Sequence, residues 1–290
     1  MRKKWLPLSL CFTLFFFPSG GTVVRNLADL PPPSVSLYAQ PLTVVTYNTR
    51  GCRTDAGSAD PALIVAALRP LAADIIALQE VDVRLPRSQF VNQIAAIASA
   101  LKMNYAFGPS IDFAIGSYGN AVLSKFPILH AKTIPLPAEW EPRSLLDVTV
   151  DWNGAPLHVL ATHLGVKQSE HGEQIESLQT YLQEKSYNNS VLLGDFNMLP
   201  GDSLFASLRT LYTDTLFDEN IVLRTLKGTG AAKQIDRIMH TPDLACLEAS
   251  APAVGPSDHY PVLMKLARAA FPSPHGDDRV VDRSRSQPLS

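Results

Sequence analysis

The sequence predicts a single α/β domain with mixed β-sheets and helices on their outer sides. The chain has 290 residues, of which 46% are hydrophobic and 18% charged, and this composition supplies enough apolar material for one large core. Short runs rich in β-branched residues alternate with amphipathic helical segments. Helices separate only some of the strands, so both parallel and antiparallel strand pairs are expected.

The first half of the domain is predicted to alternate strands with helices. The expected strands cover residues 42–49 and 74–79, and the expected helices cover 61–68 and 90–101. Asp60 is the predicted N-cap of the first helix. Pro61 would be its first residue, where the missing amide proton leaves no hydrogen bond unmade.

The second half is predicted to be richer in strands. Asn153-Gly154 lies between two alternating runs and indicates a hairpin turn. A long helix is predicted over residues 169–184, and Asp202 is expected to cap a short one. The strands are expected at 121–124, 128–133, 145–151, 157–162, 190–193, 234–239, 245–248 and 261–265. Segments 108–119, 133–143 and 218–233 are interpreted as loops.

The two ends of the chain differ in composition from the middle. The N-terminus has cations, then an apolar run, then Pro-Ser-Gly-Gly, which is the order of an export signal. That run is shorter than the about 20 residues of a membrane span. We expect export to the periplasm or the extracellular space, with an uncleaved membrane anchor as the alternative. The predicted parts are a signal (1–21), an extended leader (22–40), a catalytic domain (41–270) and a disordered tail (271–290).

Charge and cysteine content narrow the possible classes of protein. The formal net charge is -2, which argues against the broad basic surface that holds duplex DNA without excluding a few local cations. Cys11 lies in the predicted signal. Cys52 and Cys246 have no metal-ligand spacing and are expected to be independent thiols, with a disulfide as the alternative. No catalytic cysteine is expected.

Polar side chains stand at the ends of the predicted apolar strands, where a rigid scaffold can direct them toward one cleft. The set comprises two amides, four carboxylates and two histidines. This composition suits a hard cation with an acid/base pair better than zinc, which favours more His or Cys ligands. The inferred metal is Mg²⁺, with Mn²⁺ as the alternative. The set consists of Asn48, Glu80, His163, Asp195, Asn197, Asp236, Asp258 and His259.

The strings around these residues form a specific pattern. Between Thr43 and Leu266 the chain reads, in order, Tyr-Asn, Leu-Gln-Glu, Gly-Asn-Ala-Val-Leu-Ser, Thr-His-Leu, Gly-Asp-Phe-Asn, Ile-Asp-Arg and Ser-Asp-His-Tyr-Pro. In these strings it resembles the endonuclease/exonuclease/phosphatase superfamily, whose members include deoxyribonuclease-, sphingomyelinase- and inositol-phosphatase-like hydrolases. The resemblance implies a four-layer sandwich of two packed mixed β-sheets flanked by helices.

The resemblance also implies a role for each position. Glu80 would ligate the metal, with Asn48 and Asp258 in or near its coordination shell. Asp195 would orient or activate the attacking water. Asn197 would bind a nonbridging phosphate oxygen. His259, held by Asp236, would stand next to the scissile phosphate. His163 would be a second histidine, on the side of the leaving group.

Three further residues have two possible interpretations each. The resemblance favours Arg143 as a bidentate phosphate ligand, against a surface salt bridge. Asn120 is either a substrate-binding residue in the cleft or a turn residue before a strand. His171 stands where similar bacterial sequences often carry arginine, and it is interpreted as a surface residue.

The sequence therefore predicts a divalent-metal-dependent phosphodiesterase, with a phosphomonoesterase as the less favoured form. Its substrate would be a nucleic acid, a lipid headgroup or a small phosphoester. One alternative is a binding module that kept the fold and lost turnover, although the complete polar set argues against it. Another is a hydrolase held at a membrane surface by the uncleaved N-terminus. No protein partner is indicated, and a monomer is expected.

Overall fold

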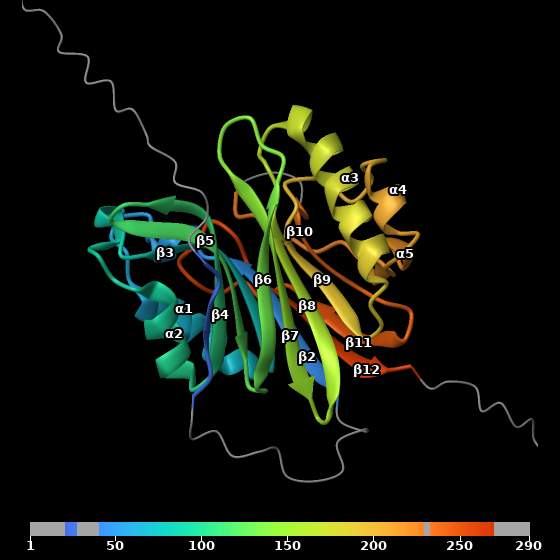
Figure 1. The fold of residues 1–290 in the computed structure, drawn as a ribbon, viewed down its shortest axis with the longest axis horizontal. Helices are drawn as coiled ribbons and strands as arrows, with labels where there is room; N and C mark the ends of the chain where they lie inside the picture. The colour runs from blue at the N-terminus through green and yellow to red at the C-terminus, as the bar shows by residue number, and fades with distance from the viewer. Residues whose placement is uncertain (1–20, 28–40, 229–232, 270–290) are drawn as a thin grey trace, which may run out of the picture.

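Two β-sheets pack face to face, with helices on both outer sides (Figure 1). The computed structural model describes residues 21–27, 41–228 and 233–269. The four layers confirm the predicted fold class. The predicted tail, most of the predicted leader and all but one residue of the predicted signal lie outside the described residues.

The seven-stranded sheet is mixed. Only β2 and β3 are parallel, and the other neighbouring strands in it are antiparallel. In spatial order its strands are β1 (Val23–Arg25), β4 (Asn104–Phe113), β5 (Gly116–Ser124), β3 (Ile75–Val83), β2 (Leu42–Asn48), β12 (Val262–Arg268) and β11 (Leu244–Ser250). β1 lies within the predicted leader and pairs with β4 at the sheet edge.

The five-stranded sheet is also mixed, because β8 and β9 are parallel. Its strands in spatial order are β10 (Asp236–His240), β9 (Ser190–Asp195), β8 (Ala155–His163), β7 (Arg143–Trp152) and β6 (Ile128–Leu136). The predicted turn joins β7 to β8, and both of its residues have positive φ, 58° at Asn153 and 84° at Gly154. That backbone matches the twist of an antiparallel hairpin.

The main core lies between the sheets. Val44 and Ile75 of one sheet and Val148, Val159 and Leu193 of the other belong to one cluster and are fully buried. Alternate side chains of each strand point to opposite faces, so the second face of each sheet is also apolar and needs a cover. The helices supply it.

Helices cover the two outer faces separately. Those over the seven-stranded sheet are α1 (Pro61–Leu68) and α2 (Gln93–Leu101), and those over the five-stranded sheet are α3 (Gln168–Lys185) and α4 (Phe205–Leu208). The short α5 (Thr215–Asp218) instead places Leu216 in the main core cluster. Asp60 caps α1 as predicted and accepts a hydrogen bond from Ala62 N. Among the described residues, no helix combines the length and apolarity needed to cross a membrane.

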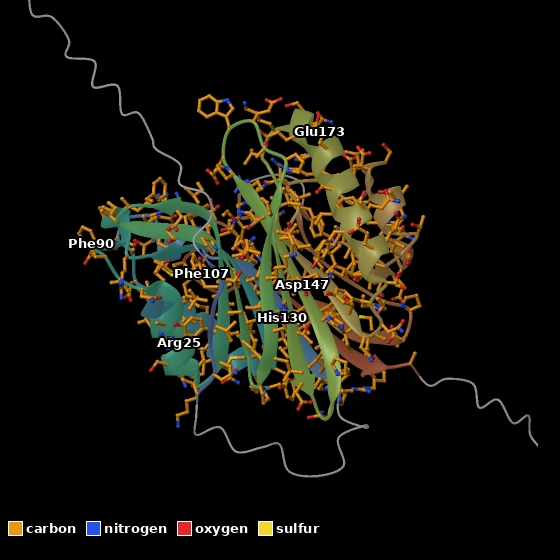
Figure 2. All side chains as sticks on the ribbon, in the orientation of Figure 1. Arg25, Phe90, Phe107, His130, Asp147 and Glu173 are labelled. Atoms are coloured by element: carbon orange, nitrogen blue, oxygen red, sulfur yellow. The ribbon has the colours of Figure 1, made fainter. Side chains whose placement is uncertain are left out.

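The start predicted for the second helix is wrong by three residues. Asn92 is the N-cap and accepts from Ala95 N, so α2 begins at Gln93. Phe90 has a φ of 59°, is 61% exposed and points away from the domain (Figure 2). The apolar residues continue on the N-terminal side of the cap, so the pattern predicts a helix that starts too early.

The segment 108–119 is a β-hairpin of β4 and β5, which corrects the predicted loop. Its glycines resemble turn residues in the sequence, but they allow backbones to approach closely. A Cβ on Gly119 would lie 2.1 Å from Gly108 O, and one on Gly116 would lie 2.5 Å from Val83 O. Close approach, rather than chain reversal, accounts for glycine at these positions.

Candidate active site

The polar residues meet because of how the strands run. β2 and β3 are parallel, and so are β8 and β9, so each pair ends at the same edge of its sheet. Asn48 and Glu80 stand at one such edge and His163 and Asp195 at the other. Asn48 Nδ2 lies 3.0 Å from Asp195 Oδ2, so the two edges face each other across the sandwich.

Three of the predicted residues form a row across neighbouring strands. His163 pairs with Asp195, and Asp195 pairs with Asp236 in the adjacent antiparallel strand. Directly opposite residues in a sheet have their side chains on the same face. The strand register therefore places one imidazole and two carboxylates side by side.

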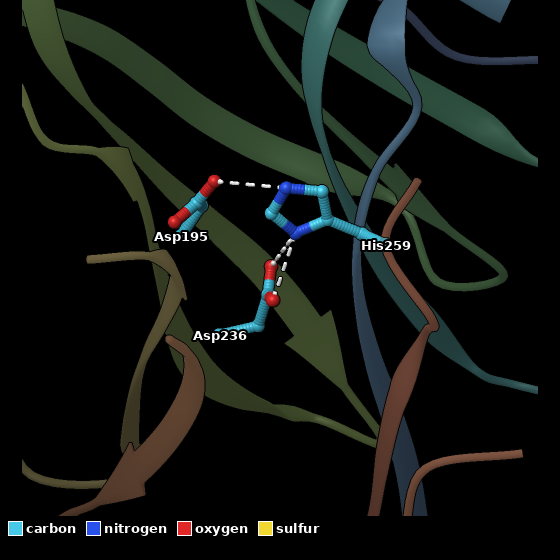
Figure 3. Close-up of side chains that lie close together, drawn as sticks. All are labelled: Asp195, Asp236 and His259. Atoms are coloured by element: carbon cyan, nitrogen blue, oxygen red, sulfur yellow. Dashed lines mark hydrogen bonds and ion pairs between the residues drawn. The ribbon is translucent and has the colours of Figure 1, made fainter. Parts of the chain in front are cut away.

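His259 completes the row from the segment before β12. Its Nδ1 lies 2.9 Å and 3.1 Å from the two carboxylate oxygens of Asp236, and its Nε2 points to Asp195 at 3.7 Å (Figure 3). Burial alone would lower the pKa of His259. The charge and hydrogen bond of Asp236 outweigh burial and raise it to about 9. His259 is accordingly an imidazolium at neutral pH.

Asp195 is the central carboxylate. Its Oδ2 accepts from Asn48 Nδ2 at 3.0 Å, and its Oδ1 accepts from Asn197 N at 3.0 Å. Burial, followed by the negative charge of Asp236, raises the pKa of Asp195 to about 7. A carboxyl group that titrates near neutral pH is suited to accepting a proton.

His163 is held in one neutral form. Burial, followed by the charges of Arg143 and His259, keeps the pKa of His163 well below its usual range. Arg143 Nη1 lies 3.2 Å from His163 Nδ1. A guanidinium only donates hydrogen bonds, so Nδ1 is the acceptor and the ring proton is on Nε2. Nε2 lies 3.5 Å from Asp195 Oδ2, so His163 directs its proton toward the central carboxylate.

Replacing Arg143 with methionine is expected to release this tautomer. In the wild type, ¹⁵N spectra of the imidazoles should show His163 protonated at Nε2 alone. The variant should populate the Nδ1–H form and lose about 10²-fold in kcat/KM for a phosphodiester. The matched control Arg69→Met, at an exposed arginine, should change neither. An unchanged His163 spectrum in Arg143→Met would contradict the tautomer assignment.

Asn48 connects the two acidic sides of the site. Its Nδ2 donates to Glu80 Oε1 and to Asp195 Oδ2, both at 3.0 Å, while its Oδ1 accepts from Arg50 N. The amide therefore acts as a bridge between two carboxylates, and its predicted ligation of a metal stays a prediction.

Glu80 has a φ of 58° and lies in a register shift of β3 between Leu78 and Val81. Such a bulge turns a side chain out of the strand's alternation.

Asp258 lies on the open side of the site. Its side chain is 48% exposed, and Arg50 Nε lies 3.7 Å from its Oδ2. The neighbouring Ser257 hydroxyl donates to Asn48 O at 2.7 Å, which ties this segment to β2. Neither Arg50 nor Ser257 is among the residues predicted from the sequence. Ser257 could have been found from its place in the Ser-Asp-His string, whereas no pattern marks Arg50.

The two asparagines differ in position. Asn197 has a φ of 52°, and its Nδ2 donates to Leu164 O, which holds it beside His163. Asn120 lies inside β5, not before a strand, and donates to Ser144 O at 2.9 Å, connecting the two sheets. Its substrate contact stays a prediction. Arg143 is 5% exposed and pairs at 2.7 Å with Glu141, whose side chain is 47% exposed. Its phosphate contact stays a prediction.

The interpretation of His171 as a surface residue is wrong. The side chain is buried, and its Nε2 donates to Gly165 O at 2.7 Å. Gln174 Oε1 accepts from Gly165 N on the same turn. The first turn of α3 packs against the segment that follows His163. The position of His171 in the helix does not show that this segment covers it. His171 and Gln174 therefore fix the loop beside the site.

The Cys52 thiol is poorly suited to nucleophilic catalysis. Cys52 and Cys246 are both free, as expected for independent cysteines. Burial, followed by the charge of Asp82, raises the pKa of Cys52 to about 12. A thiol with this pKa is protonated at neutral pH and is a poor nucleophile.

The sequence profile of the Endonuclease/Exonuclease/phosphatase family matches residues 45–259, the span that carries every predicted catalytic residue. The chain belongs to this family. Proteins of the Endonuclease/Exonuclease/phosphatase family act hydrolytically on phosphoester bonds, which agrees with the row of carboxylates and imidazoles found here. The family resemblance noted in the sequence is thereby confirmed.

Similar proteins include one curated sequence and several solved structures. Escherichia coli (strain K12) YbhP is 28% identical over 142 residues, which cover 45% of this chain and 56% of that protein, so the match spans about half of each. An endonuclease/exonuclease/phosphatase from Beutenbergia cavernae has a TM-score of 0.67 at 23% identity, covering 79% of this chain and 72% of the other. A Bacteroides thetaiotaomicron mannosyl-6-phosphatase has a TM-score of 0.63 at 18% identity, covering 78% and 99%. At these identities the structural likeness shows the fold alone.

Proposed function

We propose that this protein is a divalent-metal-dependent phosphodiesterase. The observation that carries the proposal is the arrangement of Asp195 between the imidazolium of His259 and the neutral, Nε2-protonated His163. One group can accept a proton, one carries positive charge and one donates a hydrogen bond. Attack on an anionic phosphodiester requires these three functions.

The residues fit a hard divalent cation. Asn48 Nδ2 joins Glu80 Oε1 to Asp195 Oδ2, and carboxylate oxygens are ligands that such a cation prefers. Asp195, Asp236 and His259 also place potential ligand atoms within 4.8 Å of one another. Asp195 and Asp236 are both buried, while His259 supplies one positive charge and Arg143 is already paired with Glu141. Burial, followed by the negative charge of Asp236, raises the pKa of Asp195. A bound Mg²⁺ or Mn²⁺ would offset this negative charge and would polarise a phosphoryl oxygen.

The chain's own residues divide the remaining work. Asp195, once ionised, orients the attacking water and accepts its proton. His259 stabilises the charge that grows on the phosphoryl oxygens, and Asp236 keeps it protonated and fixes its ring. His163 donates its Nε2 proton in a hydrogen bond to the leaving oxygen.

Chelation tests the metal requirement. With bis(p-nitrophenyl) phosphate as substrate, we expect turnover in Mg²⁺ to fall by at least about 10²-fold in excess chelator and to return when Mg²⁺ is restored. Faster hydrolysis of the monoester p-nitrophenyl phosphate would favour a phosphomonoesterase. Binding of inorganic phosphate without turnover of either ester would contradict the proposal and favour a binding module.

We further propose that the protein is exported and acts as a monomer. The signal-like order of the first 21 residues supports export, and the net charge of -2 favours small or lipid-like esters over duplex DNA. Sizing the N-terminus of the protein recovered from periplasm and membranes would separate a cleaved signal from a retained anchor. Light scattering of the purified protein would test the monomer.

A further inference from the structure

An apolar cavity of about 530 Å³ lies beside the candidate active site. The end of the β4–β5 hairpin forms one wall with Ile111, Phe113 and Tyr118. Leu85, which precedes the short 3-10 helix η4 (Pro86–Ser88), forms part of the other. Ligand-binding pockets in proteins typically have volumes of about 300–1,000 Å³, so this cavity can hold an organic group.

A chain of contacts connects the cavity to the catalytic residues. Glu141 lines the cavity and pairs with Arg143, which contacts His163. On the opposite side, strand register places Asp82 opposite Tyr118 of the hairpin. Burial, followed by the charge of the nearby Glu80, raises the pKa of Tyr118 well above its usual value. A group in the cavity would therefore lie next to a phosphoester held at Asp195.

Hydrogen bonds and packing hold the wall of the cavity in place. Arg87 donates to both carboxylate oxygens of the fully buried Asp82, with its Nη2 2.7 Å from Oδ1. This bond holds the guanidinium over the Tyr118 ring, 5.0 Å from its centre. Leu85, Ile111 and Tyr118 are each under 10% exposed and form a cluster of their own. The wall is consequently fixed before any ligand arrives.

We propose that this cavity binds an apolar organic group, alkyl or aryl, carried by the substrate next to its scissile phosphoester. The inference rests on the proposed function and adds the substrate class. Burying apolar surface against this wall is favourable. Sugar hydroxyls would find few hydrogen-bonding partners there, because Arg87 and Glu141 are the charged residues of the lining and both are already paired. The structure thus favours esters of apolar alcohols over esters of sugars.

The binding test uses two phosphonates that cannot be hydrolysed, methylphosphonate and butylphosphonate, titrated calorimetrically in Mg²⁺. Ile115 is 58% exposed at the cavity mouth, so Ile115→Asn adds polarity there without disturbing the core. Leu129→Asn, at a 61% exposed leucine on β6, is the matched control. We expect butylphosphonate to bind at least about tenfold more tightly than methylphosphonate. Complete burial of its three additional methylene groups would set an upper limit of roughly 60-fold on this ratio of affinities.

The preference should shrink in Ile115→Asn and persist in Leu129→Asn. Equal affinity for the two phosphonates, no detectable butylphosphonate binding, or a preference unchanged by Ile115→Asn would overturn the inference. Hydrolysis of p-nitrophenyl esters with the same two alkyl groups separates the two proposals. A binding preference without any turnover would refute the proposed phosphodiesterase activity and support the apolar binding pocket. Turnover without a binding preference would support the phosphodiesterase activity and refute the pocket.

Discussion

Replacing His259 with alanine is expected to lower kcat for a phosphodiester by about 10³- to 10⁴-fold, because an imidazolium acting on the reacting phosphate is lost. The same change leaves Asp236 buried without its partner. Circular dichroism should accompany the kinetics to show that the fold persists. His130→Ala removes an exposed histidine from β6 and should keep full activity. A His259→Ala enzyme within tenfold of the wild type would remove His259 from the mechanism.

The pH profile provides a sharper form of this prediction. The folded-state pKa of His259 is about 9, so the protonated form, and with it kcat/KM, should be lost as the pH rises through that value. In Asp236→Asn the carboxylate that outweighs burial is gone, so the pKa of His259 should fall and the alkaline limb should move to lower pH by more than one unit. An alkaline limb that stays in place would show that a different group controls it.

Replacing Gly194 with alanine is expected to destabilise the protein by at least about 4 kcal/mol, or to prevent folding. Gly194 has a φ of 149°, and a Cβ there would lie 1.9 Å from Thr162 O and 2.9 Å from Thr162 C. These are backbone atoms of β8, so no side chain can move aside. Since Asp195 follows directly, the strain would also displace the central carboxylate.

Denaturant unfolding measures this effect, with Gly172→Ala as the matched control. Gly172 lies in α3, and apart from its chain neighbours and the backbone of the helix itself, nothing lies within 4 Å of the position that an alanine methyl group would take there. The control should therefore be neutral or stabilising by up to about 1 kcal/mol. A Gly194→Ala protein with a midpoint within error of the wild type would contradict the role assigned to this glycine.

The sequence alone determined the features that depend on local pattern. Asp60 and Pro61 specified the start of α1, and Asn153-Gly154 specified the β7–β8 turn, because capping and positive φ are properties of a few adjacent residues. The candidate site positions could also be found from the sequence, since polar residues at the ends of apolar strands stand out. His163, Asp195 and Asp236 were found in this way and lie in one row.

Tertiary structure decided everything that depends on contacts between distant segments. The hairpin glycines, the buried His171 and the donor role of Asn48 each follow from a partner strand or loop that no local pattern reveals. The pKa of Asp195 is one such property, because burial and the charge of Asp236 combine only after β9 and β10 pair. The cavity beside the site is another. Its walls come from segments separated in the chain, and packing alone brings them together.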